Sequence, residues 1–253
     1  MPKFEKIRTP EEKEFEKFAA KYLEVLQDKK VPNIYKVLLR QKGFLLVLGK
    51  LKPMSEMEWN PEILDEWKKI KIWQDRDFNG ISRLLLKKFN LHSSKIQKSP
   101  EIIKFKIYDQ DQVKDQIKKI PQLLAWDTQK NIEEWIEDNI NAGINRDLIY
   151  GTLYGFPKSA IEFYIKHHGL AHILHQNIGT YGENYGVEKG NLPEDVKLRE
   201  KQKKNFFQKL SKDTAIQNEF KKLDPLKDKL IAIKNKEILK RTKYQVDTRK
   251  EYE

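Results

Sequence analysis

The chain contains no cysteine among its 253 residues. This absence excludes disulfide bonds, zinc ribbons, thiolate catalysis and iron–sulfur clusters, because each of these needs the cysteine sulfur atom. A cysteine-free composition is compatible with a reducing compartment. We therefore expect a soluble, cytoplasmic protein.

Long hydrophobic runs are also missing from the sequence. The longest apolar stretch, around Phe44–Leu48, is far shorter than the about 20 residues that a transmembrane helix needs. A signal peptide needs an apolar core, whereas the N-terminal segment reads MPKFEKIRTPEEKEFEKF and is charged throughout. We expect neither a secretory signal nor insertion into a membrane.

The short motifs of several enzyme classes are absent as well. The sequence holds no G-x-G-x-x-G or Walker A pattern for phosphate binding and no G-x-S-x-G pattern for a serine nucleophile. Carboxylate pairs are plentiful, but a single sequence does not select one pair for acid–base catalysis. These observations favour a non-enzymatic protein without excluding an enzyme.

The composition predicts a mainly α fold. Apolar residues make up 38% of the chain and charged residues 35%, a balance that suits amphipathic helices with one buried stripe each. We expect at most a minor β element, near residues 43–49 and 102–108. The second segment has partial alternation and β-branched residues, whereas the first could be a strand or a helix.

Several local patterns predict where helices begin. Thr9-Pro10-Glu11-Glu12 combines a capping hydroxyl, a proline in the first turn and a glutamate three residues after the cap. Further helices are predicted from Asn60-Pro61, over 113–120 and 127–140, from Pro193 and from Asp224-Pro225. Residues 145–168 predict helix, turn and helix, either as a core αα-hairpin, which we favour, or as a DNA-binding motif.

Positive charge is concentrated near the C-terminus. Residues 1–196 hold 32 Lys/Arg against 29 Asp/Glu, a net charge of +3, and residues 197–253 hold 18 against 9, a net charge of +9. Between these parts the sequence becomes rich in Gly and Tyr. We expect a near-neutral helical domain over 1–176, a loop or hinge over 177–192, and a basic helical extension over 193–253.

This charge distribution favours a binding protein that contacts nucleic-acid backbone, or another polyanion, through its C-terminal helices. Only eight of the 50 basic residues are Arg, which argues against base-specific contacts. An ordinary solvated lysine surface is the alternative explanation. The candidate contact residues are Lys201, Lys203, Lys204, Lys209, Lys221, Lys222, Lys240 and Arg241.

A histidine cluster supplies a different hypothesis, a metal-binding protein or metal-dependent enzyme. On a continuous helix, His168, His172 and His175 would have i, i+4 and i+7 spacing and could hold a divalent metal. Gly169 could instead end the helix and break this spacing. We favour partly exposed surface histidines over a metal site.

Aromatic residues suggest two further roles. Tyr181 and Tyr185 lie in the Gly-rich segment, where their rings could stack on a base or another planar ligand, although such loops commonly bind nothing. Phe206, Phe207 and Leu210 could dock the C-terminal segment onto a protein partner, which would make the chain a protein-interaction module.

Two segments resemble a family of uncharacterised bacterial proteins. They are Gly49-Lys-Leu-Lys-Pro53 and Asp147-Leu-Ile-Tyr-Gly-Thr-Leu-Tyr-Gly-Phe-Pro157. That family pairs an early Gly-x-Lys-Pro segment with a later Leu-Gly-Tyr-Pro helix-turn-helix, in the same order. The chain lacks the cysteines that its members carry near the C-terminus. The resemblance implies no activity, and implies only that residues 43–168 form one domain.

Overall fold

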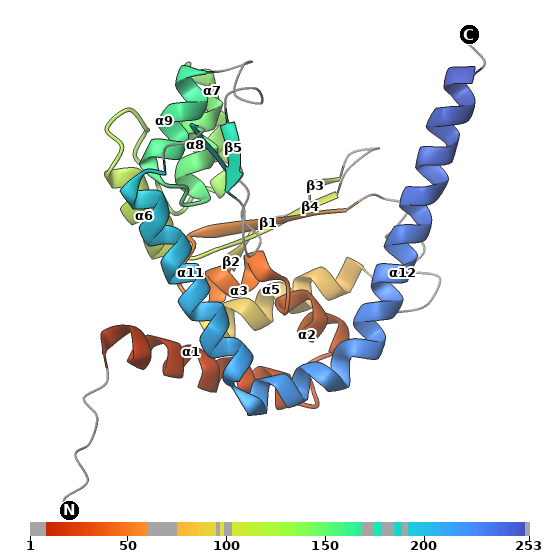
Figure 1. Cartoon of the computed structure of the whole chain (residues 1–253). Helices are drawn as coiled ribbons and strands as arrows, with labels where there is room; N and C mark the ends of the chain where they lie inside the picture. The colour runs from red at the N-terminus through yellow and green to blue at the C-terminus, as the bar shows by residue number, and fades with distance from the viewer. Residues whose placement is uncertain are drawn as a thin grey trace, which may run out of the picture.

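The structure is a computed structural model, and it describes residues 9–59, 75–94, 97–98, 103–167, 175–178, 185–188 and 192–250. These residues form helices around a small antiparallel sheet, which confirms a mainly α fold with a minor β element. Figure 1 shows the sheet between two groups of helices, with α11 (Glu194–Lys212) beside both groups. The first part of α12 (Thr214–Lys250) runs along the base, and the helix then rises on the right toward the C-terminus. None of the described helices is both long enough and apolar enough to cross a membrane. The helix expected after Asn60-Pro61 lies outside the described residues.

The first helical group begins with a strong local signal. Its members are α1 (Pro10–Gln27), α2 (Asn33–Leu39), α3 (Lys42–Leu48) and α5 (Asp75–Phe89). The Thr9 hydroxyl accepts a hydrogen bond from the Glu12 amide at 3.2 Å, and the Glu12 carboxylate accepts one from the Thr9 amide at 2.8 Å. This capping box pairs donors that the first turn would leave unsatisfied, and it confirms the predicted start of α1.

Residues 43–49, one of the two places where a β element is expected, form α3 instead of a strand. Every side chain from Phe44 to Leu48 is buried. The helix lies against α2, β1 (Met54–Trp59) and β4 (Ile103–Tyr108). A helix that is covered by protein on several sides has no polar face, so the periodicity of its sequence does not distinguish it from a strand.

The sheet is built around β4, the strand that its sequence predicts. β4 pairs in antiparallel fashion with β1, with β2 (His92–Ser93) and with β3 (Gln97–Lys98). Strand β1 has no clear signal in its own sequence. This strand reads MSEMEW and lacks β-branched residues, so its own composition is not typical of a strand. Its full-length pairing with β4 supplies the stabilisation that local propensity does not.

Neighbouring side chains of β4 enter different cores. Phe105 and Ile107 pack into a first core with α1, α2, α3, α5, α11 and α12. Tyr108 belongs to a second core that includes α6 (Gln110–Lys118), α7 (Ile132–Asn141) and α8 (Arg146–Leu153). Strand side chains alternate between faces, so Lys106 lies on the same face as Tyr108. Glu56 of β1 is the cross-strand partner of Lys106.

The helix–turn–helix predicted for residues 145–168 is a core hairpin of α8 and α9 (Lys158–Lys166). Ile149 and Leu153 are buried in the second core, which confirms the favoured interpretation. Gly155 has a φ of +66°, and a Cβ atom there would lie 2.5 Å from Cδ of Pro53. The two segments that resemble the bacterial family are therefore in contact at this turn.

Part of the segment expected to be a loop forms a β-hairpin. β5 (His175–Ile178) pairs in antiparallel fashion with β6 (Tyr185–Glu188). Val187 is buried in a small third core with Ala160 of α9 and Val196 of α11. Strands of four residues have little stability alone. Packing against α9 stabilises this hairpin, and the sequence of the segment does not reveal such packing.

The C-terminal helices are helical as predicted, but their first part is not an extension beyond a separate domain. Phe206 of α11 and Phe220 of α12 are buried in the first core with residues of α1 and α2. The ring centroid of Phe206 lies 5.1 Å from that of Phe18. The expected boundary at 177–192 therefore does not separate these helices from the preceding core.

The same burial affects the expected protein-docking surface. Phe206 is 7% exposed and Leu210 is 3% exposed. Phe207 is half-buried and packs against the first core. Phe206 and Leu210 therefore stabilise the fold and are not accessible to a partner.

Helix α12 continues through Pro225, whereas the sequence predicts a new helix at Asp224-Pro225. Proline lacks one amide donor and usually interrupts a helix. Arg40 bridges the turn that precedes it, because its guanidinium donates to the Phe220 carbonyl and to the Asp224 carboxylate, each at 2.9 Å. Burial of Phe220 and Leu223 holds the same turn against the core.

Tyr22 has a buried hydroxyl with no hydrogen-bond partner and a side chain that is 0% exposed. Burial raises the pKa of this hydroxyl far above its usual range, although the nearby Arg40 opposes the shift. An unpaired buried hydroxyl costs about 1–3 kcal/mol. We expect Tyr22→Phe to raise the free energy of unfolding by about 1 kcal/mol, measured by urea denaturation. A decrease would mean that the hydroxyl has a stabilising partner in solution.

Candidate functional site

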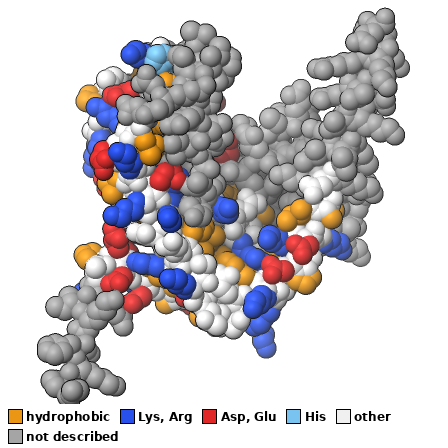
Figure 2. Space-filling view, viewed as in Figure 1, with side chains coloured by type: hydrophobic (Ala, Val, Ile, Leu, Met, Phe, Trp, Pro, Cys, Tyr) orange, Lys and Arg blue, Asp and Glu red, His pale blue; other side chains and the backbone are white. Residues whose placement is uncertain are grey.

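Exposed lysines line one side of α11. Lys197, Lys201, Lys204 and Lys212 are exposed, and helical geometry places them within one face, called here the α11 lysine face. The segment from Lys201 to Lys212 contains five lysines and no acidic residue. Figure 2 shows Lys and Arg side chains along the surface over α11 and the base of the molecule, with Asp and Glu among them.

Lys203 is not part of this face, although the sequence analysis includes it among the contact residues. It is 0% exposed, and its ammonium forms an ion pair with Glu200. Lys203 precedes Phe206 and Leu210 by three and seven residues, so it lies on the buried stripe of α11. The helical spacing of Lys203 relative to Phe206 and Leu210 could have identified it as buried, whereas a count of charges could not.

Lys209 is also turned toward the body of the protein. Its ammonium lies 5.8 Å from the ring centroid of Phe15. It lines a groove of about 200 Å³ together with Glu11 and Glu14 of α1. These carboxylates offset its charge, so Lys209 contributes less positive potential than the α11 lysine face.

The lysines of α12 form a less uniform group. Lys221 and Lys222 are exposed, and the Lys222 ammonium lies 2.7 Å from the Glu219 carboxylate. Lys240 and Arg241 belong to α12, and their side chains lie outside the described part of the chain. α12 thus adds exposed lysines beyond the corner that follows α11.

The histidines expected to bind metal do not share one continuous helix. α9 ends at Lys166, and His175 begins β5. The chain leaves the helix before Gly169, so the i, i+4 and i+7 spacing of the three histidines does not describe their arrangement. His168 and His172 lie outside the described residues, and a divalent-metal site there stays a prediction.

Of the two tyrosines expected to form a stacking loop, the structure describes only Tyr185. Tyr185 begins strand β6 and pairs with Ile178 of β5, so it belongs to the hairpin and not to a loop. Tyr181 lies outside the described residues. Ligand stacking at these tyrosines stays a prediction.

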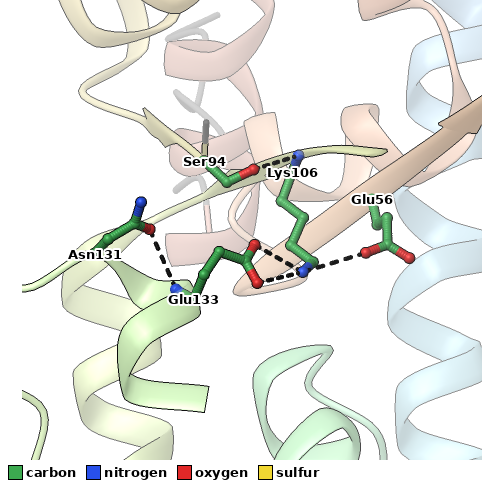
Figure 3. Close-up of polar contacts among 5 residues, drawn as sticks. All are labelled: Glu56, Ser94, Lys106, Asn131 and Glu133. Carbon is green, nitrogen blue, oxygen red and sulfur yellow. Dashed lines mark hydrogen bonds and ion pairs between the residues drawn. The ribbon is translucent and has the colours of Figure 1, made fainter. Parts of the chain in front are cut away.

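A buried charge cluster, which no pattern in the sequence predicts, lies between β1, β4 and α7. The Lys106 ammonium donates to both carboxylate oxygens of Glu133, at 2.7 and 2.9 Å, and lies 3.5 Å from the carboxylate of Glu56 (Figure 3). Two local contacts fix the backbone around it. The Lys106 amide donates to the Ser94 hydroxyl, and the Glu133 amide donates to the Asn131 side chain that caps α7. Lys106 is 2% exposed, and its carboxylate partners come from β1 and α7, so the strand pattern of IKFKIY alone does not reveal the cluster.

The cluster forms one wall of a cleft between the sheet and helices α7 and α8, with a volume of about 500 Å³. Tyr154 lines the cleft, and its hydroxyl donates a hydrogen bond to Glu56. Burial raises the pKa of Tyr154 well above its usual range, and the Glu56 carboxylate raises it further. Burial also raises the pKa of Tyr108 to about 12, with a smaller contribution from Glu133. Both phenols therefore remain protonated hydrogen-bond donors near neutral pH.

No protein-family model, no curated protein and no solved structure matches the chain.

Proposed function

We propose that the protein binds the phosphate backbone of nucleic acid, without sequence preference, through the α11 lysine face. The supporting observation is the set of four exposed lysines on one side of a helix whose other side is packed into the core. A helix held in this way presents its charges at fixed spacing, so little order has to be gained on binding. The proposal retains Lys201 and Lys204 from the sequence analysis and adds Lys197 and Lys212.

The chemistry of the face suits phosphate contacts better than base contacts. Lysine ammonium groups act as point charges on phosphate, whereas guanine recognition prefers the planar guanidinium of Arg. Lys197 lies 3.4 Å from Glu194 in an exposed ion pair. Such a pair is worth little in water and leaves the lysine available to a phosphate.

Fluorescence anisotropy with a short labelled DNA duplex and a short labelled RNA tests this proposal. We expect the quadruple variant Lys197→Gln, Lys201→Gln, Lys204→Gln and Lys212→Gln to bind at least about tenfold more weakly at low salt, because four phosphate contacts are lost. The matched control replaces exposed lysines elsewhere with Gln, at Lys118, Lys119, Lys158 and Lys166. It lowers the net charge equally. The proposal would be contradicted if both variants weakened nucleic-acid binding equally. It would also be contradicted if neither variant weakened it.

Point substitutions are preferable to removal of the C-terminal helices. A chain that ends before α11 would lose Phe206, Leu210, Phe220 and Leu223 from the first core. Loss of binding by such a fragment would not distinguish an unfolded protein from a missing contact surface.

A further inference from the structure

The cleft between the sheet and helices α7 and α8 has the size of a small-molecule site. Its volume of about 500 Å³ falls within the roughly 300–1,000 Å³ typical of such sites. Charged, hydroxyl-bearing and aromatic side chains from two strands, β1 and β4, and two helices, α7 and α8, converge on it. Its lining includes Glu56, Lys106, Glu133, Arg146, Tyr150 and Tyr154.

The cleft offers fixed hydrogen-bond acceptors. Each oxygen of Glu133 accepts one hydrogen bond from Lys106, and the side chain is 14% exposed. A carboxylate has about four lone-pair sites, so Glu133 can accept further hydrogen bonds from a ligand. Lys106 already orients the carboxylate, and binding therefore needs no rearrangement of it.

Aromatic surface and donors complete the lining. The rings of Tyr150 and Tyr154 are nearly parallel, with centroids 6.2 Å apart and an interplanar angle of 18°. Arg146 is exposed beside them and brings the five N–H donors of a guanidinium group. The cleft thus presents acceptors from α7, donors from α8, and tyrosine rings at the end of α8.

Charges in and beside the cleft are balanced. Glu56, Glu133 and Glu137 line it together with Lys106 and Arg146. The Lys52 ammonium lies 5.3 Å from the ring centroid of Tyr154 and supplies a third positive charge. Three carboxylates against three cations favour a ligand without net charge over an anion or a cation.

We propose that this cleft binds a small polyhydroxylated molecule of the size of a monosaccharide or disaccharide. Each hydroxyl both donates and accepts, so it can pair with Glu133 on one side and Arg146 on the other. The C–H face of a sugar ring is apolar enough to pack against Tyr150. This site is separate from the α11 lysine face, and its occupancy does not depend on nucleic-acid binding.

Saturation-transfer difference NMR with the full chain tests the proposal, with D-glucose, D-galactose, D-mannose and maltose as probes. We expect at least one of these sugars to bind. Arg146→Gln, an exposed position that folding should tolerate, should weaken that binding about tenfold, because a charge-assisted hydrogen bond is lost. Tyr150→Ala should weaken it to a similar extent.

Arg83→Gln provides the matched control, because Arg83 is exposed on α5 and does not line the cleft. This variant should bind the same sugar as well as the wild type. Two results would overturn the proposal: no binding of any of the four sugars, or binding that Arg146→Gln and Arg83→Gln affect equally. Binding of 1,4-diaminobutane with no binding of a sugar would overturn it in favour of a cation site.

Discussion

Replacement of Lys106 by methionine is expected to lower the free energy of unfolding by about 3–5 kcal/mol, although the new side chain fills most of the same volume. Lys106 is 2% exposed, and its ammonium contacts Glu133 at 2.7 Å and Glu56 at 3.5 Å. These two carboxylates are themselves only 14% and 17% exposed. Without the ammonium they lie close together with no positive charge between them, which is costly in a poorly solvated site. Urea denaturation followed by circular dichroism measures the change.

A triple variant separates charge from packing at the same site. Glu56→Gln, Lys106→Met and Glu133→Gln together remove all three charges while the side chains keep similar shapes. We expect this variant to recover most of the stability lost by Lys106→Met, because it buries three neutral side chains instead of two carboxylates without a cation. A loss below about 1 kcal/mol for Lys106→Met alone would show that water already solvates the cluster.

Phe206→Ala is expected to lower the free energy of unfolding by about 3–5 kcal/mol. The Phe206 ring centroid lies 5.1 Å from that of Phe18 and 5.7 Å from that of Phe15, and the side chain is 7% exposed. A Cβ atom at Gly49 would lie 2.4 Å from the Phe206 ring, so α3 also packs closely on it. Truncation would leave a cavity at the junction of α1, α3 and α11.

Phe207→Ala is the neighbouring control. Phe207 is half-buried at the edge of the same core, so its truncation should cost only about 1 kcal/mol. Both variants should unfold in one cooperative transition, because α11 and the N-terminal helices share a core. A separate early transition that Phe206→Ala leaves unchanged would contradict the assignment of α11 to that core.

Features that depend on neighbouring residues could be predicted from the sequence. The capping box at Thr9 satisfies its donors within one turn, and β4 carries the strand pattern in its own side chains. The hairpin of α8 and α9 follows from two apolar faces and a turn with a glycine. Each of these signals lies within a few residues of the structure that it specifies.

Features that depend on distant contacts could not be predicted in this way. β1 is a strand because it pairs with β4, and α12 continues through Pro225 where Arg40 bridges the preceding turn. Glu56, Lys106 and Glu133 come from three separated segments, and no spacing in the sequence relates them. The cleft depends on this convergence, so the sequence contains no local sign of it.

At Lys203 the lysine prediction is wrong for a reason that the sequence does contain. Lys203 has the helical phase of Phe206 and Leu210, whereas Lys201 and Lys204 lie on the opposite side of α11. A net charge counts both kinds of lysine equally. Placing the charges on a helical wheel would have separated the buried lysine from the exposed ones.

The salt dependence of DNA binding tests the central proposal most directly. The DNA affinity is measured from low to physiological salt for three proteins. They are the wild type, the quadruple Gln variant of the α11 lysine face and the matched surface control. Each phosphate contact contributes about −0.9 to the slope of log affinity against log salt concentration on duplex DNA. We predict that the quadruple variant reduces the magnitude of this slope by about three to four, while the control keeps the wild-type slope. An unchanged slope in the quadruple variant, or a wild-type protein that does not bind, would contradict the proposed function.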